Sequence, residues 1–218
     1  ESTRPGSNPV NEDEEMKRIL PVIEELKKRV NIPVSIDTRK AEVARRAISA
    51  GAEIINDVTG LKHDPSLAAV AAEAHAPIIL CHIKGTPRDM QENPSYENLI
   101  AEILDSLIES IEVAKERGVN EESIVIDPGI GFGKRVEHNL EIFNRLPSFK
   151  SLGRPILVGP SRKAFIGALL DGAPPGERLE GTIAASVIAL AGGAKVFRVH
   201  DVAPLKKALK VAQAILGA

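Results

Sequence analysis

The stretch Ile124–Lys134 reads Ile-Val-Ile-Asp-Pro-Gly-Ile-Gly-Phe-Gly-Lys. Three apolar residues with high β-propensity run directly into a carboxylate, Asp127, which a proline and a glycine follow. A short, fully apolar run that ends in a polar residue and a glycine loop is typical of a buried parallel strand. We therefore expect a parallel strand here, with reactive groups at its carboxyl end.

Five further apolar runs end in a similar way, and a helical pattern follows each of the six. We expect strands at residues 32–36, 53–58, 77–81, 124–127, 155–158 and 195–199, and helices at residues 12–30, 40–50, 66–74, 96–117, 137–146, 164–170, 182–191 and 204–216. Strands that alternate with helices predict βαβ units and a parallel sheet. The composition, with 3% aromatic residues and no Trp, predicts an aliphatic core.

The α/β class leaves two architectures open, a doubly wound open sheet and a TIM (β/α)8 barrel. We favour the barrel, because its reactive residues come from the ends of many strands, and nearly every strand here contributes one. Eight units take about 250 residues, whereas this chain of 218 residues contains six. We therefore expect residues 1–218 to form a single barrel domain without its first two β/α units. Its two open edges are expected to prevent it from folding alone.

Composition and charge exclude several classes of protein. A net charge of -2 without a long basic run gives no electrostatic basis for binding nucleic acid. No apolar run approaches the roughly 20 residues that span a membrane, and the single cysteine, Cys81, excludes an internal disulfide framework. We expect a cytoplasmic protein in which Cys81 is a small buried residue. We also expect His63, His75 and His138 to lie on the surface.

Polar side chains stand at the strand ends, and a barrel brings these ends to one mouth. Taken alone, Asp37 and Thr38 are expected to cap a helix, whereas the pair Asn56-Asp57 and Asp127 also fit turns. Together, the carboxylates and the amide suit a heterocycle with several N–H donors, while guanidinium and imidazole groups suit a polyanion. Ser161 and the helix start after it offer a second anion site. The set directed to the mouth comprises Asp37, Asn56, His82, Asp127, Lys163, Arg198 and His200, with Arg4 beside its cations.

Three glycines precede Lys134 at alternate positions and superficially resemble a phosphate-binding loop. The Walker pattern needs four residues between its first glycine and Gly-Lys-Ser/Thr, and Arg135 stands where the Ser or Thr would follow. We therefore reject nucleotide binding for this stretch.

Six motifs, in order along the whole chain, resemble those of the dihydropteroate synthase family: Ser2–Ser7 (STRPGS), Ser35–Thr38 (SIDT), Ile54–Asp57 (IIND), Asp127–Lys134 (DPGIGFGK), Ser161–Lys163 (SRK) and Arg198–Asp201 (RVHD). The resemblance implies a TIM barrel that forms a homodimer and uses Mg2+. It also implies that 6-hydroxymethyl-7,8-dihydropterin diphosphate is joined to p-aminobenzoate, giving dihydropteroate and diphosphate for folate synthesis, and that sulfonamides compete with aminobenzoate.

The resemblance also assigns roles to individual residues. It implies catalytic roles for Lys163, Arg198, His200 and Asp37; pterin binding by Asp37, Asn56, Asp127, Lys163 and Arg198; diphosphate binding by Thr3, Arg4, Arg198 and His200; and aminobenzoate binding by Phe132, Ser161 and Lys163. No metal ligand is identified, since the first-strand loop that supplies one in the family has no counterpart here. Two alternatives remain, a non-catalytic or incomplete pterin-binding module and a corrinoid-linked methyltetrahydrofolate methyltransferase.

Overall fold

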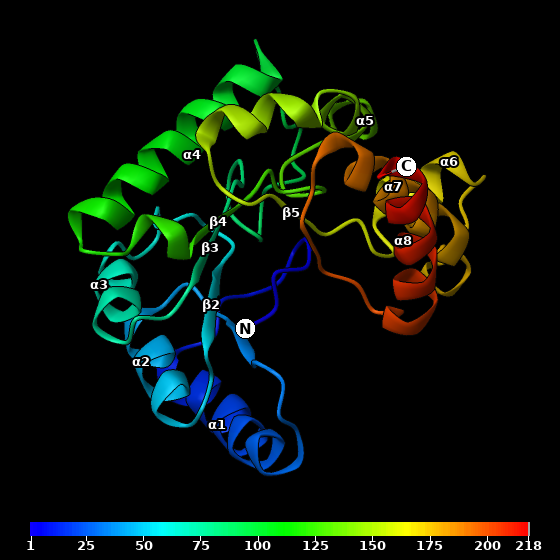
Figure 1. The fold of residues 1–218 in the computed structure, drawn as a ribbon. Coiled ribbons are helices and arrows are strands. Elements are labelled where there is room, and N and C mark those ends of the chain that lie inside the picture. The colour runs from blue at the N-terminus through cyan, green and yellow to red at the C-terminus, as the bar shows by residue number, and fades with distance from the viewer. Residues whose placement is uncertain (218) are drawn as a thin grey trace.

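Six short strands follow one another in a curved parallel arrangement, and helices surround them (Figure 1). The computed structural model describes residues 1–217. The strands are β1 (Ser35–Asp37), β2 (Ile54–Asp57), β3 (Ile78–Cys81), β4 (Ile124–Asp127), β5 (Leu157–Val158) and β6 (Val196–Phe197). The first four form one parallel sheet in sequence order and the last two form a second. A parallel bridge between Ile126 and Ile156 joins the two sheets, so that all six strands follow one path.

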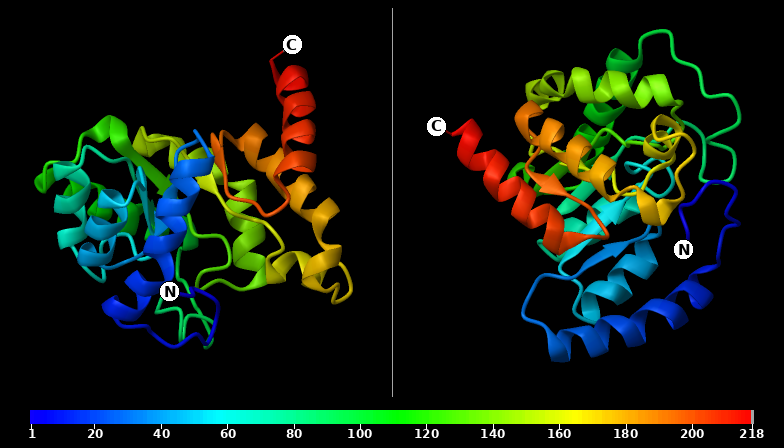
Figure 2. Two further views of the ribbon diagram at one scale, coloured as in Figure 1. Left: turned by 90° about the horizontal axis from the view of Figure 1, so that it is seen from below. Right: turned by 90° about the vertical axis from the view of Figure 1, so that its right-hand side faces the viewer.

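All eight expected helices are present, and Figure 2 shows them from two further sides. They are α1 (Glu12–Arg29), α2 (Ala41–Ser49), α3 (Ser66–Glu73), α4 (Leu99–Glu116), α5 (Val136–Asn144), α6 (Ala164–Leu169), α7 (Leu179–Gly192) and α8 (Val202–Leu216). Short 3-10 turns lie at Glu121–Ser123, Leu146–Leu152 and Pro175–Glu177. Helix α1 continues through Pro21. No helix in residues 1–217 is long and apolar enough to cross a membrane.

The strands are shorter than their apolar patterns. The first was expected from residue 32, yet β1 begins at Ser35. Pro33 has no N–H to donate to a neighbouring strand, and Ile32 before it is 67% exposed. The aliphatic core is confirmed, because the largest fully buried side chains are Ile and Leu residues together with a single Phe, Phe149.

The register of the strands puts their polar ends side by side. Asp37 of β1 pairs with Asn56 of β2, and Cys81 of β3 pairs with Asp127 of β4. Since parallel strands end at the same edge of a sheet, this register collects the polar residues at one mouth.

Two expectations about buried and exposed side chains have different outcomes. Cys81 is buried, as expected, and His63 and His75 are exposed. The expectation for His138 is wrong, because this side chain is only 8% exposed. It lies in the first turn of α5, where its Nδ1 accepts a hydrogen bond from the Arg135 N–H at 3.1 Å. Its ring also packs edge-on against Tyr96. Helix capping and packing against an aromatic ring therefore draw this histidine inward.

Candidate active site

Asp127, at the end of β4, is the carboxylate at the centre of the mouth, and its side chain is 2% exposed. One oxygen, Oδ1, accepts a hydrogen bond from the Gly129 N–H at 2.8 Å. The other, Oδ2, accepts one from Arg198 at 3.2 Å. One oxygen of Asp127 therefore forms the turn, and the other faces Arg198 in the mouth.

The Arg198 guanidinium lies between two acceptors of the mouth. Besides Asp127, it donates a hydrogen bond to Oδ1 of Asn56. Burial opposes its positive charge, but neighbouring groups, Asp127 foremost, outweigh this and raise the pKa of Arg198. A Cβ on Gly159 would lie 3.4 Å from Arg198 Nη1, so the absence of a side chain at residue 159 leaves room for the arginine. Arg198 thus joins β6 to β2 and β4 across the mouth.

Asp37, at the end of β1, is exposed and does not cap a helix. The first N–H of α2, from Ala41, instead donates to Asp64 Oδ2 at 2.8 Å, so the capping expectation for Asp37 and Thr38 is wrong. Although Asp37 is open to the mouth, the surrounding protein displaces much of its solvent. This desolvation raises its pKa, and the charge of Arg198 offsets part of the rise.

Asn56 and Asp57 are adjacent in the chain, but their side chains make different contacts. Asp57 is buried and accepts hydrogen bonds from the N–H groups of Thr59 at 2.8 Å and Leu61 at 2.6 Å, which closes the turn after β2. Asn56 is left to contact Arg198. The turn interpretation is therefore confirmed for Asp57, whereas Asn56 lies at the mouth beside Arg198.

Lys163, immediately before α6, lies against the glycine loop that follows β4. Its Nζ donates a hydrogen bond to the Ile130 carbonyl at 2.8 Å and lies 3.9 Å from the centre of the Phe132 ring. Burial lowers the pKa of Lys163, and the negative charge of Asp127 offsets part of this shift. The structure therefore brings Lys163, Phe132 and Asp127 together, although they come from two different strand ends.

Ser161 and His200 also meet, from the ends of β5 and β6. Ser161 Oγ lies 2.9 Å from His200 Nδ1 and accepts a hydrogen bond from the His200 N–H at 3.1 Å. Next to them, Arg162 forms a two-point ion pair with Asp201 at 2.7 and 3.0 Å. No role is predicted for Arg162 and Asp201 from the motifs, although their opposite charges in two motifs of the site are a usable signal. They connect the two motifs that carry Lys163 and Arg198.

We expect Ser161→Ala to lower the free energy of unfolding by about 1 kcal/mol, because the variant loses the link between the ends of β5 and β6. Chemical denaturation measures this change. The matched control is Ser151→Ala, whose exposed hydroxyl bonds only to the carbonyl of Ser148. Equal stability of the two variants would contradict a structural role for the link between Ser161 and His200.

The N-terminal loop with Thr3 and Arg4 lies beside the loop between β3 and α4, as the right-hand view of Figure 2 shows. The Gly6 N–H donates a hydrogen bond to the Pro87 carbonyl at 3.0 Å. Arg4 and Arg198 are both cationic donors, so an anion, and not a direct contact, would join them.

His82 is not an open group of the mouth, in contrast to the expectation from its place at the end of β3. Its ring is buried, and its Nδ1 lies 2.8 Å from Lys134 Nζ. Burial, and then the charge of Lys134, lower the pKa of His82 to about 2. Lys134 itself is 3% exposed. Its Nζ is directed to His82 and to the Phe132 carbonyl, whereas the lysine of a phosphate loop points to the phosphates.

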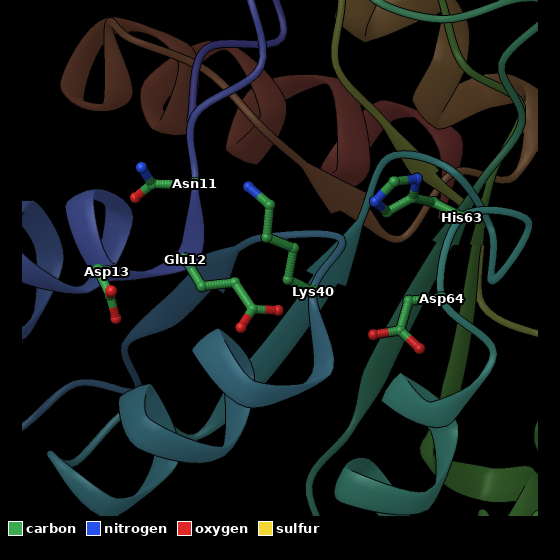
Figure 3. A pocket seen from close by; sticks show the side chains of 6 residues that line it. All are labelled: Asn11, Glu12, Asp13, Lys40, His63 and Asp64. Carbon is green, nitrogen blue, oxygen red and sulfur yellow. The ribbon is translucent and has the colours of Figure 1, made fainter.

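A separate cavity of about 570 Å³ lies outside this set of residues (Figure 3). It is lined by Asn11, Glu12, Asp13, Lys40, His63 and Asp64. Its main polar groups already have structural partners, since Lys40 Nζ lies 2.6 Å from Glu15 Oε2 and Asp64 bonds to the first turn of α2. We therefore place the functional site at the strand ends and not in this cavity.

The comparisons with known proteins agree with this geometry. A family model described as pterin binding enzyme matches residues 1–200. A dihydropteroate synthase of Synechocystis sp. is 47% identical over 215 residues, which cover 99% of this chain and 74% of that protein. A Yersinia pestis dihydropteroate synthase solved with a sulfonamide drug complex has a TM-score of 0.95 at 38% identity, and the match covers 100% of this chain and 78% of that one.

A dihydropteroate synthase of Xanthomonas albilineans with 4-aminobenzoic acid matches with a TM-score of 0.93 at 41% identity, over 100% of this chain and 77% of that one. These matches support the TIM-barrel class, in which reactive residues lie at the carboxyl ends of the strands. Identity above 30% over nearly the whole chain shows the family as well as the fold. The chain therefore belongs to the pterin-binding enzyme family, among the dihydropteroate synthases.

Proposed function

We propose that the mouth joins 6-hydroxymethyl-7,8-dihydropterin diphosphate to p-aminobenzoate, with the pterin on Asp127, Asn56 and Asp37. The observation that supports this most directly is the position of the Arg198 guanidinium, which donates to Asp127 and Asn56. The amino group and ring N–H of a pterin form a similar planar set of donors. A pterin would therefore satisfy the same two acceptors when it displaces the arginine.

Displacement gives Arg198 a second task. Released from Asp127, its guanidinium is free to bind the diphosphate together with His200, Arg4 and Thr3. Guanidinium groups match phosphate oxygens at two points, and fixed cations stabilise the negative charge that develops on a leaving diphosphate. Arg198 is thus paired with the same carboxylate that the pterin would occupy.

The aminobenzoate would lie beside Phe132, Ser161 and Lys163. Lys163 already contacts the Phe132 ring. Ser161 follows β5, the strand next to β4, which carries the pterin acceptor Asp127. The amine nitrogen attacks the methylene carbon of the pterin substrate, the carbon–oxygen bond breaks, and diphosphate leaves with the bonding electrons. The amine then loses a proton. Lys163, Arg198, His200 and Asp37 would act by position and charge, and no covalent enzyme intermediate is needed.

Magnesium is implied by the family, but the described residues offer no ready site for it. Within residues 1–217, no group of three or more His, Cys, Asp and Glu side chains is arranged to hold a metal ion. Asp127 and Asp57 already accept hydrogen bonds, and the groups expected to bind diphosphate are mostly cations. We therefore assign no step of the reaction to a metal bound by these residues.

The direct test is incubation of the protein with pterin diphosphate and p-aminobenzoate, with and without Mg2+, followed by detection of 7,8-dihydropteroate. Its formation would support the proposal. Pterin binding without turnover would favour a non-catalytic pterin-binding module. Binding of methyltetrahydrofolate with indifference to p-aminobenzoate would favour the methyltransferase. No feature of the structure supports the methyltransferase over the synthase.

Two further properties are part of the proposal. Exposed apolar side chains on α7 and α8, including Ile188, Val211 and Ile215, support association into a homodimer. A cytoplasmic, reducing location suits the single thiol, Cys81.

A further inference from the structure

Lys134 is a buried cation for which the proposed reaction has no use. Among the described residues, it is the one lysine or arginine whose side chain is buried. Burying an ammonium group is costly unless the group has partners, so its position requires an explanation. Its Nζ has two, since it lies 2.8 Å from His82 Nδ1 and donates to the Phe132 carbonyl at 3.0 Å.

The first partner, His82, is a fixed anchor at the end of β3. Its backbone N–H donates a hydrogen bond to the Asp127 carbonyl at 3.0 Å, which ties His82 to β4. Because its pKa is lowered to about 2, its ring is neutral at ordinary pH, and Nδ1 can accept from the lysine. The close approach of the glycine loop supports this arrangement, since a Cβ on Gly129 would lie 1.8 Å from the His82 carbonyl oxygen.

The second partner, Phe132, belongs to the irregular loop after β4, and its ring faces the other lysine. Lys163 Nζ lies over that ring and also donates to the Ile130 carbonyl. The loop is therefore bound from two sides, by Lys163 at the ring and by Lys134 at the backbone of the same residue. Lys134 Nζ is directed to His82 and to the Phe132 carbonyl, so its contact is with the loop and not with the substrates.

We propose that Lys134 is a positioning residue for aminobenzoate, which fixes the Phe132 backbone to the end of β3 and so sets the ring against which the substrate binds. The inference rests on the proposed function, because it assumes that Phe132 borders the aminobenzoate. It assigns a task to the lysine of the glycine-rich motif, and this task differs from the phosphate contact that the motif superficially suggests.

The environment of Lys134 also makes the contact sensitive to pH. Burial lowers the pKa of Lys134 to about 7, with Cys81 and Asp127 opposing the shift and Lys163 adding to it. The ammonium form therefore predominates below neutral pH, and the weaker neutral donor predominates above it. The titratable or charged groups that face Lys134 are Cys81 and His82 from β3, Asp127 from β4, His138 from α5 and Lys163 at the start of α6.

The test compares wild type with Lys134→Met and Lys134→Arg in steady-state assays between pH 6 and 8. We expect Lys134→Met to raise the KM for aminobenzoate about three- to tenfold, the effect of one hydrogen bond, with little change in pterin affinity measured by calorimetry. We expect the KM of wild type to rise with pH, and this dependence to be smaller in Lys134→Met. Lys134→Arg keeps the donor and its charge, so it should restore a low KM that varies less with pH than in wild type.

The matched control is Ser110→Ala, since the buried Ser110 hydroxyl donates to the carbonyl of Gly60 in the loop after β2. We expect this variant to lose stability without a change in aminobenzoate KM. A Lys134→Met protein that melts earlier but keeps the KM and pH profile of wild type would overturn the inference. If Lys134→Met does not fold, a pH-independent KM in wild type overturns it instead. Failure of the proposed function would appear separately, as wild type that makes no dihydropteroate.

Discussion

Asp127→Asn is expected to weaken pterin binding by about 1–3 kcal/mol, because one acceptor of the mouth becomes a misplaced donor. The substitution is well suited to the site, since Asp127 uses its two oxygens for different tasks. An asparagine can keep an oxygen toward the Gly129 N–H and preserve the turn. Its amide NH2 would then point to the place where Arg198 donates now and where the pterin would donate.

Isothermal titration with a free pterin measures this loss, and denaturation checks that the fold is intact. Asp57→Asn is the matched control, because Asp57 is an equally buried carboxylate at the end of β2 whose bonds go to its own turn. We expect the control to lose stability and to bind pterin more tightly than Asp127→Asn does. Unchanged pterin affinity in Asp127→Asn would remove Asp127 from the proposed role.

Arg198→Ala is expected to affect two ligands in opposite ways. The pterin diphosphate should bind less tightly by about 1.5–3 kcal/mol, or roughly 10- to 100-fold, because a charged hydrogen-bond donor to its phosphates is lost. Free pterin should bind at least as tightly as in wild type, because the guanidinium no longer competes for Asp127 and Asn56. Calorimetry with both ligands, and the KM for the diphosphate substrate, test these expectations.

The control for Arg198→Ala is Arg154→Ala, which removes an arginine that is paired with Glu121 away from the mouth. It should leave the affinity for both ligands unchanged. Equal losses of pterin and pterin diphosphate in Arg198→Ala would argue against an anion role for Arg198. Any weakening of free pterin binding in Arg198→Ala would contradict the proposed displacement.

The sequence was sufficient for the elements of the fold and for several of the polar residues that the structure brings to the strand ends. Apolar periodicity located all eight helices and all six strands, because burial of one helix face or of a whole parallel strand leaves a pattern in neighbouring residues. The start of β1 was placed too early, since apolar character extends beyond the residues that pair. The motifs also identified Asp37, Asn56, Asp127 and Lys163, which lie at or beyond the carboxyl ends of the strands.

The orientation of each side chain depended on contacts between distant residues. Asn56 and Asp57 are adjacent and similar, yet one contacts Arg198 and the other closes a turn. His82 and His138 are buried by a lysine and a tyrosine that lie 52 and 42 residues away in the chain. No local pattern predicts such partners, because they are brought together only when strands and helices pack.

The stretch Ile124–Lys134 shows this division clearly. Its local pattern is enough to predict a buried strand that ends in a carboxylate and a glycine loop, since these depend on burial and backbone freedom of neighbouring residues. That one oxygen of Asp127 faces Arg198, and that Lys134 turns inward to His82, depends on the packing of distant segments. The physical reason is that hydrogen bonds and charges act over a few ångströms in space, whatever the separation along the chain.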